Sequence, residues 1–322
     1  MAPPTRIDVH HHFFPQNLNK AKANESVGWR TPAENLPWSP QLSLHFMDVS
    51  KIDLAILSFP PISAGSVSQE NRDMARLRNR GMADIRAAHP SRFGFFATLP
   101  FLDDVEGALA EIAYAFDELH ADGISLASSY GEGAAATYIG DDRYIPIWQA
   151  LNARRAVVFL HGAQTPSSTP HPHPFLGIPV VEVPNETFKA AAHLVVTGRK
   201  RTFPDVRIIL AHLGGSTPFL APRVAVLSRH MGCTLSEEEI MEDFKSFYYE
   251  TALSAHETTL TAMKTLVSPD RILFGTDFPA VSTDMVASYT RNLEKYHAGD
   301  DQKLEDVMAA NSLVLFPRLR DL

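Results

Sequence analysis

The sequence has a single cysteine, Cys233, among its 322 residues. One cysteine excludes an intramolecular disulfide, and a free thiol persists best in a reducing compartment. The sequence also lacks an apolar run of 18 residues, which argues against a membrane-spanning helix. Its first residues lack the charged and apolar regions of a signal peptide. We therefore expect a cytoplasmic protein with no membrane partner.

Phosphate-binding and nucleic-acid-binding patterns are also missing. No glycine-rich loop of the form GxGxxG or GxxxxGK occurs, which disfavours a nucleotide cofactor. The net charge is -8, and no cluster of Lys and Arg is interleaved with aromatic residues, which disfavours a nucleic-acid partner. A small anionic substrate remains compatible with this charge, because it needs only one or two local cations.

Short apolar runs rich in β-branched residues alternate with longer segments of helical period. These runs predict eight strands, at residues 6–10, 53–58, 92–99, 123–128, 156–161, 207–212, 247–253 and 271–276. Eight strand–helix units favour an α/β fold of the closed (β/α)8 TIM-barrel type, in which all 322 residues form one domain. An open doubly wound sheet is the alternative.

The segments between the strands are of two kinds. Some carry helical stripes, such as Leu220, Val224, Leu227 and Met231, which we interpret as packing faces. Residues 15–40 and 163–184 are instead rich in proline and poor in regular apolar spacing. We expect these two stretches to be irregular loops over the active face of the barrel.

Candidate metal ligands lie at the ends of the predicted strands. His10 and His12 close the first strand, and alternation of side chains along a strand points both to one face while His11 points to the other. Three further residues end later strands in the same way: His161, His212 and Asp277. Because the active site of a barrel lies at the carboxyl ends of its strands, these side chains are expected to share one mouth.

Each of these residues also has a structural interpretation. A histidine at a strand end is often a hydrogen-bonded core residue, which is how we interpret His11 and how His161 and His212 could also be explained. Asp277 could cap the next segment as an Asx turn. Metal binding is favoured over these structural interpretations because all of the candidate ligands lie at the carboxyl ends of barrel strands.

Taken together, five segments resemble the amidohydrolase superfamily. They are IDVHHHFFP, RFGFFATLP, VVFLHG, IILAHLGGSTPFLAPR and RILFGTDFP, in this order. Within the superfamily, the chain resembles the decarboxylase branch related to aminocarboxymuconate semialdehyde decarboxylase and the γ-resorcylate and 6-methylsalicylate decarboxylases, the last being most similar. The expected strands 123–128 and 156–161 contain no lysine that could be carboxylated to hold a second metal, so we expect one ion.

The resemblance implies roles for individual residues. His10, His12, His161 and Asp277 would hold one divalent ion, and His212 would stand beside it as a catalytic residue. Three imidazoles and a carboxylate suit Zn²⁺ or Mn²⁺ equally. Arg223 occupies the place where relatives use an arginine to bind the substrate carboxylate, sometimes across a homodimer interface; the alternative is a solvated helix residue. A homodimer is therefore expected.

The resemblance also implies a reaction. Segment 43–48 lacks the arginines that the aminocarboxymuconate enzyme has before its Met-Asp pair, which disfavours an acyclic diacid and favours a small aromatic carboxylate. We expect non-oxidative decarboxylation of an ortho-hydroxy aromatic acid, 6-methylsalicylate to 3-methylphenol and CO₂, with Asp277 as proton carrier. Two alternatives are a metal-dependent hydrolase of a lactone or amide, with Asp277 as base, and a barrel that binds a ligand without catalysis.

Overall fold

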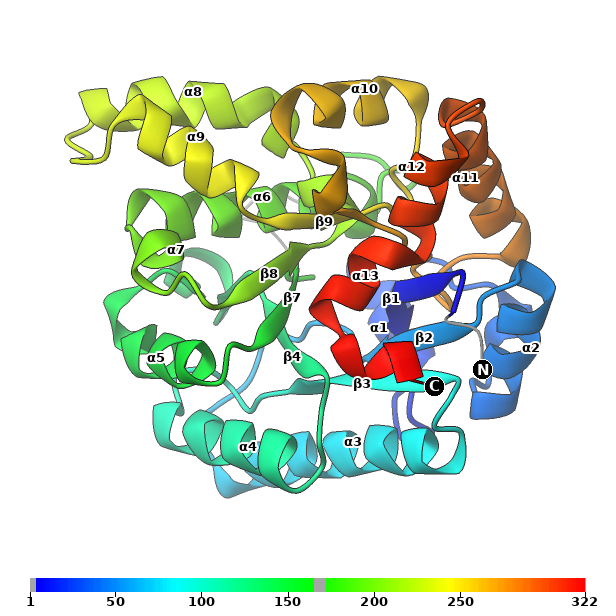
Figure 1. The fold of residues 1–322 in the computed structure, drawn as a ribbon. Coiled ribbons are helices and arrows are strands. Elements are labelled where there is room, and N and C mark those ends of the chain that lie inside the picture. Colours follow the sequence, from blue (N-terminus) through cyan, green and yellow to red (C-terminus); the bar gives the residue numbers. More distant parts are fainter. Residues whose placement is uncertain (1–3, 165–171, 322) are drawn as a thin grey trace.

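Eight parallel strands form one sheet in the computed structural model, which describes residues 4–164 and 172–321 (Figure 1). Their order in the sheet is the order along the chain. The strands are β1 (Ile7–His12), β2 (Leu54–Ser58), β3 (Phe93–Thr98), β4 (Gly123–Ala127), β7 (Val157–His161), β8 (Arg207–Leu210), β9 (Tyr248–Glu250) and β10 (Ile272–Leu273). Each overlaps one predicted strand, so the predicted barrel is confirmed. The remaining strands, β5 (Ser129–Tyr130) and β6 (Thr137–Tyr138), form a separate antiparallel pair.

Helices connect the strands and surround the sheet (Figure 1). The α-helices are α1 (Lys20–Val27), α2 (Pro40–Ser50), α3 (Gln69–Ala88), α4 (Val105–Asp117), α5 (Ile145–Ala153), α6 (Ile178–Val196), α7 (Arg199–Thr202), α8 (Thr217–His230), α9 (Glu237–Lys245), α10 (Glu257–Leu266), α11 (Thr283–Tyr296), α12 (Asp301–Glu305) and α13 (Asn311–Leu315). Single turns of 3₁₀ or π-helix complete the connections, at Ala33–Asn35, Gly133–Ala135, Asp142–Tyr144, His212–Gly214, Pro269–Arg271, Asp306–Ala310 and Pro317–Asp321. Among the described residues, none of these helices is both long and apolar enough to cross a membrane.

The barrel closes between its first strand and the segment that follows its last one. The backbone N–H of Val9 donates to Phe274 O at 3.1 Å, and that of Asp277 donates to His10 O at 2.8 Å. His12 N–H donates to Phe278 O at 2.7 Å. These bonds continue the parallel ladder beyond the two residues of β10, so the seam brings Asp277 beside the two histidines of β1.

The interior of the barrel is filled by large apolar side chains from alternating strand positions. Ile7, Val9, Phe96, Phe159 and Leu273 belong to this interior cluster and are almost fully buried. The opposite faces of the strands pack against the helices in a larger cluster. Because both faces of each strand are buried, the strands are continuous apolar runs, which is why the sequence shows them clearly.

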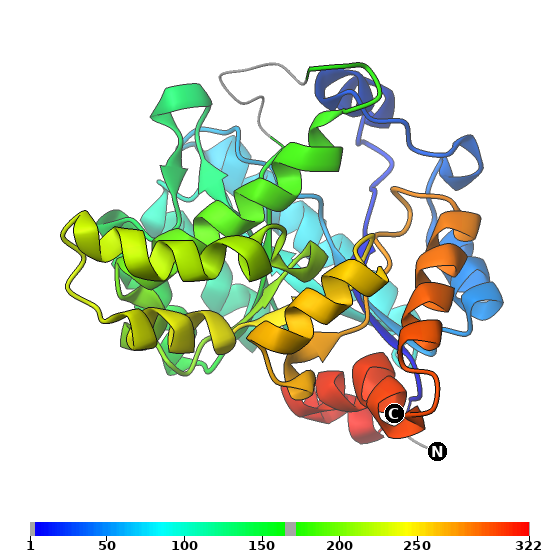
Figure 2. The ribbon, with the colours of Figure 1, turned by 90° about the horizontal axis from the view of Figure 1, so that it is seen from above.

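The two ends of the barrel differ. Leu315, Phe316 and Leu319, near the end of the chain, join the interior cluster and close the end where the strands begin. In Figure 1 α13 lies across this end, and in Figure 2 it lies at the bottom, with α1 at the opposite, upper end. The upper end is where the strands finish, so α1 and the start of α6 cover the mouth that holds the candidate ligands.

Three local features differ from the sequence-based expectations. The stretch 15–40 contains α1 and a 3₁₀ turn, and α6 begins at Ile178, inside the stretch 163–184. Residues 165–171 of that second stretch lie outside the described residues. The stripe on α8 is also incompletely packed, since Leu227 is 41% exposed and Met231, which caps the helix, is 81% exposed.

Candidate metal centre and active site

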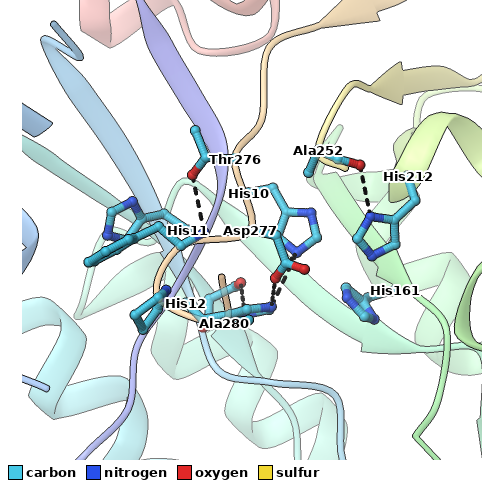
Figure 3. Close-up of polar contacts among 12 residues, drawn as sticks. His10, His11, His12, His161, His212, Ala252, Thr276, Asp277 and Ala280 are labelled. Atoms are coloured by element: carbon cyan, nitrogen blue, oxygen red, sulfur yellow. Dashed lines mark hydrogen bonds and ion pairs between the residues drawn. The ribbon is translucent and has the colours of Figure 1, made fainter. Parts of the chain in front are cut away.

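Five of the predicted site residues meet at the mouth of the barrel (Figure 3). His10 and His12 come from β1, and His161 ends β7. His212 and Asp277 lie in the segments that follow β8 and β10. Two sets of potential ligand atoms have all their members within 4.8 Å of one another: His10, His12 and Asp277, and His10, His161 and His212. His10 belongs to both sets, so it lies at the centre of the cluster.

The distances within the first set fit a metal ion. His10 Nε2 lies 3.1 Å from His12 Nε2, and Asp277 Oδ1 lies 3.4 Å and 3.0 Å from these two atoms. Ligands at about 2.0–2.1 Å from a tetrahedral zinc ion are separated by about 3.3 Å. The three atoms therefore stand at the separations that a shared coordination sphere requires.

All four imidazoles are oriented from behind by hydrogen bonds at Nδ1. The acceptors are Glu250 Oε1 for His10 at 2.9 Å, Ser58 O for His12 at 3.3 Å, Gly162 O for His161 at 2.9 Å and Ala252 O for His212 at 3.0 Å. An acceptor at Nδ1 keeps the proton on that nitrogen and leaves Nε2 as the ligand atom. Burial lowers the pKa of His10 and of His161, which favours the neutral form that binds metal.

Asp277 is held with its carboxylate toward the histidines. Its φ is 64°, a left-handed conformation that is uncommon for residues other than glycine. The turn that follows is closed by its backbone carbonyl, which accepts from Ala280 N–H at 2.9 Å, rather than by the side chain. Burial would raise the pKa of Asp277, but His10 and His12 outweigh it and hold the pKa far below its usual value. The group is therefore an ionised carboxylate.

Glu250 is a residue of the site that sequence reasoning missed. It ends β9 and is fully buried. Its Oε1 accepts from His10 Nδ1 and from the backbone N–H of His212 at 2.6 Å, and its Oε2 accepts from Ala252 N–H at 2.7 Å. Burial raises its pKa to about 7. A carboxylate closing an otherwise apolar strand at the ligand end of the barrel is the signal that could have identified it.

Glycine at position 275 makes room for Glu250. A Cβ atom at Gly275 would lie 2.1 Å from Glu250 Oε2 and 3.0 Å from the Cβ of His10. Both separations are too short for carbon and oxygen atoms that are not bonded. The absence of a side chain at Gly275 therefore leaves the space that Glu250 needs to accept a hydrogen bond from His10.

The turn after β8 places His212 through left-handed backbone. His212, Leu213, Gly214 and Gly215 all have positive φ, between 52° and 67°. A Cβ at Gly215 would lie 1.9 Å from the carbonyl oxygen of Pro184. The backbone of α6 therefore packs directly against the backbone of the turn, with no room for a side chain between them. The paired glycines thus permit both the turn and its contact with α6.

His11 and Arg223 do not join the cluster. His11 is buried on the other side of β1, where its Nδ1 lies 3.0 Å from Asp8 Oδ2 and its Nε2 lies 2.9 Å from Ser43 Oγ. The register of β1 against β2 shifts between Asp8 and His11, and this irregularity brings these two side chains together. Arg223 lies on α8, is exposed to solvent and does not line the cavity beside the cluster.

A cavity opens over the cluster. Its floor is formed by His12, His161, His212 and Asp277. Its walls are mostly apolar, and the two other polar side chains are Lys20 and Gln164; the apolar residues are Phe14, Val27, Trp29, Pro60, Pro179, Val183, Leu253 and Ala280. Val27, Ile178 and Val183 pack together with Trp29 and tie α1 to α6 above the site. A ligand in this cavity would therefore meet polar groups at the floor and mostly apolar groups elsewhere.

The chain is similar to known proteins over nearly its whole length. The family model described as amidohydrolase matches residues 7–318. The chain is 38% identical to the 6-methylsalicylic acid decarboxylase acuB of Aspergillus aculeatus, over 98% of this chain and 97% of that protein. It is 37% identical to the 6-methylsalicylic acid decarboxylase of Penicillium expansum, with the same coverage.

Solved structures with the same fold include two with bound manganese. A dihydroxybenzoic acid decarboxylase from Polaromonas sp., with manganese and the inhibitor 2-nitroresorcinol, has a TM-score of 0.82 at 24% identity, covering 98% of this chain and 97% of that one. A 5-carboxyvanillate decarboxylase from Novosphingobium aromaticivorans, also with manganese, has a TM-score of 0.80 at 20% identity and covers 97% of both chains.

Proposed function

Because the chain belongs to the amidohydrolase family, we propose that it is a metal-dependent decarboxylase of ortho-hydroxy aromatic acids that converts 6-methylsalicylate to 3-methylphenol and CO₂. The observation that carries this proposal is the convergence of histidine nitrogens and Asp277 Oδ1 on the floor of a mostly apolar cavity. The specific substrate is supported by relatives of that activity, which are 38% and 37% identical over nearly the whole chain.

We propose that His10, His12, His161 and Asp277 hold one divalent ion. When bound, the ion would polarise the hydroxyl and carboxylate oxygens of the acid and orient its ring. Zinc and manganese both suit imidazole and carboxylate ligands. Stripping the protein of metal and adding back each ion separately, with metal content and CO₂ release measured together, decides between them.

His212 and Asp277 are suited to moving the proton that replaces the carboxyl group. Nε2 of His212 faces the cavity because Nδ1 donates to Ala252 O. In the proposed sequence, Nε2 takes the proton of the substrate hydroxyl and passes it to the carboxylate of Asp277. Asp277 lines the cavity beside His12 and His212, so its carboxyl group is placed to deliver the proton to the ring carbon that bears the carboxylate.

The electron balance closes without an organic cofactor. Protonation of the ring carbon breaks aromaticity, and the electron pair of the breaking C–C bond returns to the ring as CO₂ leaves. The phenolate product then regains a proton from water. The apolar walls keep other water from the protonated ring, because Trp29, Val27 and Val183 cover the mouth.

Asp277→Asn tests the proton role. We expect CO₂ and 3-methylphenol formation from 6-methylsalicylate to fall by at least about a hundredfold, the usual contribution of a general acid. Metal content is measured on the same sample, and Asp284→Asn, which removes an exposed carboxylate on α11, is the control. Normal turnover by metal-loaded Asp277→Asn protein would refute the role.

The same assay separates decarboxylation from the two alternatives. A hydrolase acting on a lactone or amide would consume water and release no CO₂, and a non-catalytic barrel would release no product at all. The identity with named decarboxylases over 98% of the chain favours decarboxylation.

We also propose that the chain forms a homodimer through α8. Phe219, Val226 and Met231 on and beside this helix are 60%, 51% and 81% exposed, and Arg223 lies among them. Since Arg223 does not line the cavity of its own subunit, a contact with substrate would have to reach a neighbouring subunit. Sedimentation of the wild type and of Phe219→Glu tests this proposal, with a dimer expected only for the wild type.

Residues 1–322 are proposed to form one domain in the cytoplasm. The single ring of strands supports one cooperative unit, for which calorimetry would give one unfolding transition.

The lone thiol of Cys233 supports a reducing compartment, which cell fractionation tests.

A further inference from the structure

The carboxylate of an aromatic acid needs a partner inside this cavity. Removing an ionised carboxylate from water into mostly apolar surroundings is costly unless a charge or hydrogen-bond donor compensates it. Among the described residues that line the cavity, Lys20 is the one lysine or arginine. The sequence of residues 165–171 contains neither residue type. Lys20 is therefore the one lysine or arginine side chain that the same subunit offers to the carboxylate, in addition to the divalent ion proposed at the cluster.

The position of Lys20 is defined by the elements around it. Lys20 is the first residue of α1, which Asn19 caps by accepting from Lys22 N–H at 3.0 Å. The last residue of α1, Val27, packs against Ile178 and Val183 of α6. The cap thus fixes where the helix begins, the packing of Val27 ties its last residue to α6, and Lys20 is half-buried at the wall of the cavity.

The ammonium group of Lys20 is directed by an aromatic ring that also faces the metal centre. Its Nζ lies 4.4 Å from the ring centroid of Phe14, a cation–π distance. Phe14 in turn lies parallel to the His12 imidazole, with ring centroids 6.2 Å apart. Among the described residues, no carboxylate lies within 4.0 Å of Nζ. The ammonium therefore makes no direct ion pair there, and the one carboxylate whose charge reaches it is that of Asp277 in the candidate metal centre.

We propose that Nζ of Lys20 binds the carboxylate of the aromatic acid, and so makes the site select an acid over a neutral phenol. This proposal rests on the proposed function, since it assigns the carboxylate-binding residue of that reaction. It gives the task to the chain's own subunit, in contrast to Arg223, which is exposed on α8. A monomeric subunit would therefore still recognise the acid.

This role predicts which kinetic constant depends on Lys20. The carboxylate is fully charged in the bound acid and loses its charge as CO₂ forms, so the contact is strongest before the reaction. An interaction of that kind lowers KM without raising kcat. The product 3-methylphenol has no carboxylate, so Lys20 does not retain it.

The test compares Lys20→Met with Lys22→Met, which removes an exposed lysine from the same helix. Calorimetry measures binding of two probes to the metal-loaded protein: benzoate, which carries the charge, and 3-methylphenol, which does not. We expect the Kd of benzoate to rise about tenfold to a hundredfold in Lys20→Met, as for loss of one charged hydrogen bond. The Kd of 3-methylphenol should change less than twofold, and KM for 6-methylsalicylate should rise with little change in kcat.

Several results would overturn the proposal. Unchanged binding of benzoate would do so, and so would an equal loss of affinity for both probes, which would show that Lys20 only supports the cavity wall. Lys20→Arg should keep most of the benzoate affinity, and Lys20→Gln replaces Lys20→Met if that variant does not fold. A wild type that binds benzoate through Lys20 but releases no CO₂ from any ortho-hydroxybenzoate would refute the proposed function and leave this inference standing.

Discussion

Glu250 shows how one buried residue can control several parts of a site. Its two oxygens accept from three donors, which are the ring of His10 and the backbone N–H groups of His212 and Ala252. It therefore orients a candidate ligand and positions a candidate catalytic residue at the same time. Residues that hydrogen-bond to metal ligands commonly change metal affinity when they are substituted.

Glu250→Gln should weaken metal binding. The amide group cannot accept at both ends, so either Ala252 N–H or the donors at the other oxygen lose a partner. We expect the affinity for zinc or manganese to fall about tenfold to a hundredfold. Titration with a chromophoric chelator measures the affinity, with Glu257→Gln on the exposed side of α10 as control. An affinity equal to the wild type would contradict the role of Glu250.

The site residues differ in how far the sequence could predict them. His10, His12, His161 and Asp277 stood out because polar side chains end runs of apolar residues, and the structure brings them together. Glu250 was missed because its strand has only three residues, Tyr248–Glu250. Lys20 was missed because its contact with the cavity depends on how α1 packs against α6, which no local pattern encodes.

A strand or helix could be predicted from the sequence where successive residues along it are buried. All eight barrel strands were found because their two buried faces give unbroken apolar runs. Strands β5 and β6 were missed, since two residues each are too short to show alternation. Helix α1 was missed for a related reason, because only Val27 among its eight residues is buried.

At the scale of one helix, α6 should make stability depend on pH through His193. The Nδ1 of His193 accepts from the backbone N–H of Gly140 at 3.2 Å. Burial lowers the pKa of His193 below its usual value, so the folded protein prefers the neutral ring. The stabilisation is complete above about pH 6.5 and is lost as the pH falls toward the lowered pKa.

Thermal unfolding of His193→Gln tests this pH dependence. The glutamine oxygen can still accept from Gly140 but does not titrate. We expect the wild type to lose more of its Tm than the variant between pH 7.5 and pH 5.5. His230→Gln, at the exposed end of α8, is the control and should resemble the wild type. An identical fall in Tm in all three proteins would show that His193 does not cause the pH dependence of stability.

The whole molecule is held together by segments distant in sequence. The first strand hydrogen-bonds the segment after the last one, and the residues near the end of the chain close the base of the barrel. The candidate metal site bridges the same seam, because His10 and His12 lie on one side of it and Asp277 on the other. A bound ion would therefore reinforce the closure of the barrel.

Removing the metal should lower the stability of the entire barrel. An ion that binds the folded chain alone contributes about 2.7 kcal/mol when its free concentration is a hundred times its Kd. We expect the Tm to fall on chelation and to recover when zinc or manganese is restored. In Asp277→Asn the Tm should respond less to added metal. A wild-type Tm that is independent of metal would argue against an ion at the seam.

The close approach of Gly275 to Glu250 links the mutational tolerance of two positions. Alanine at 275 should be harmful beside glutamate, because the added methyl group meets Oε2. A shorter acid at position 250 moves that oxygen away from position 275. The double variant Glu250→Asp/Gly275→Ala should therefore lose less metal affinity than the sum of the losses in the two single variants. Saturation mutagenesis would then show these sites as an interdependent pair, and attempts to graft this centre onto another barrel would need to transplant both together.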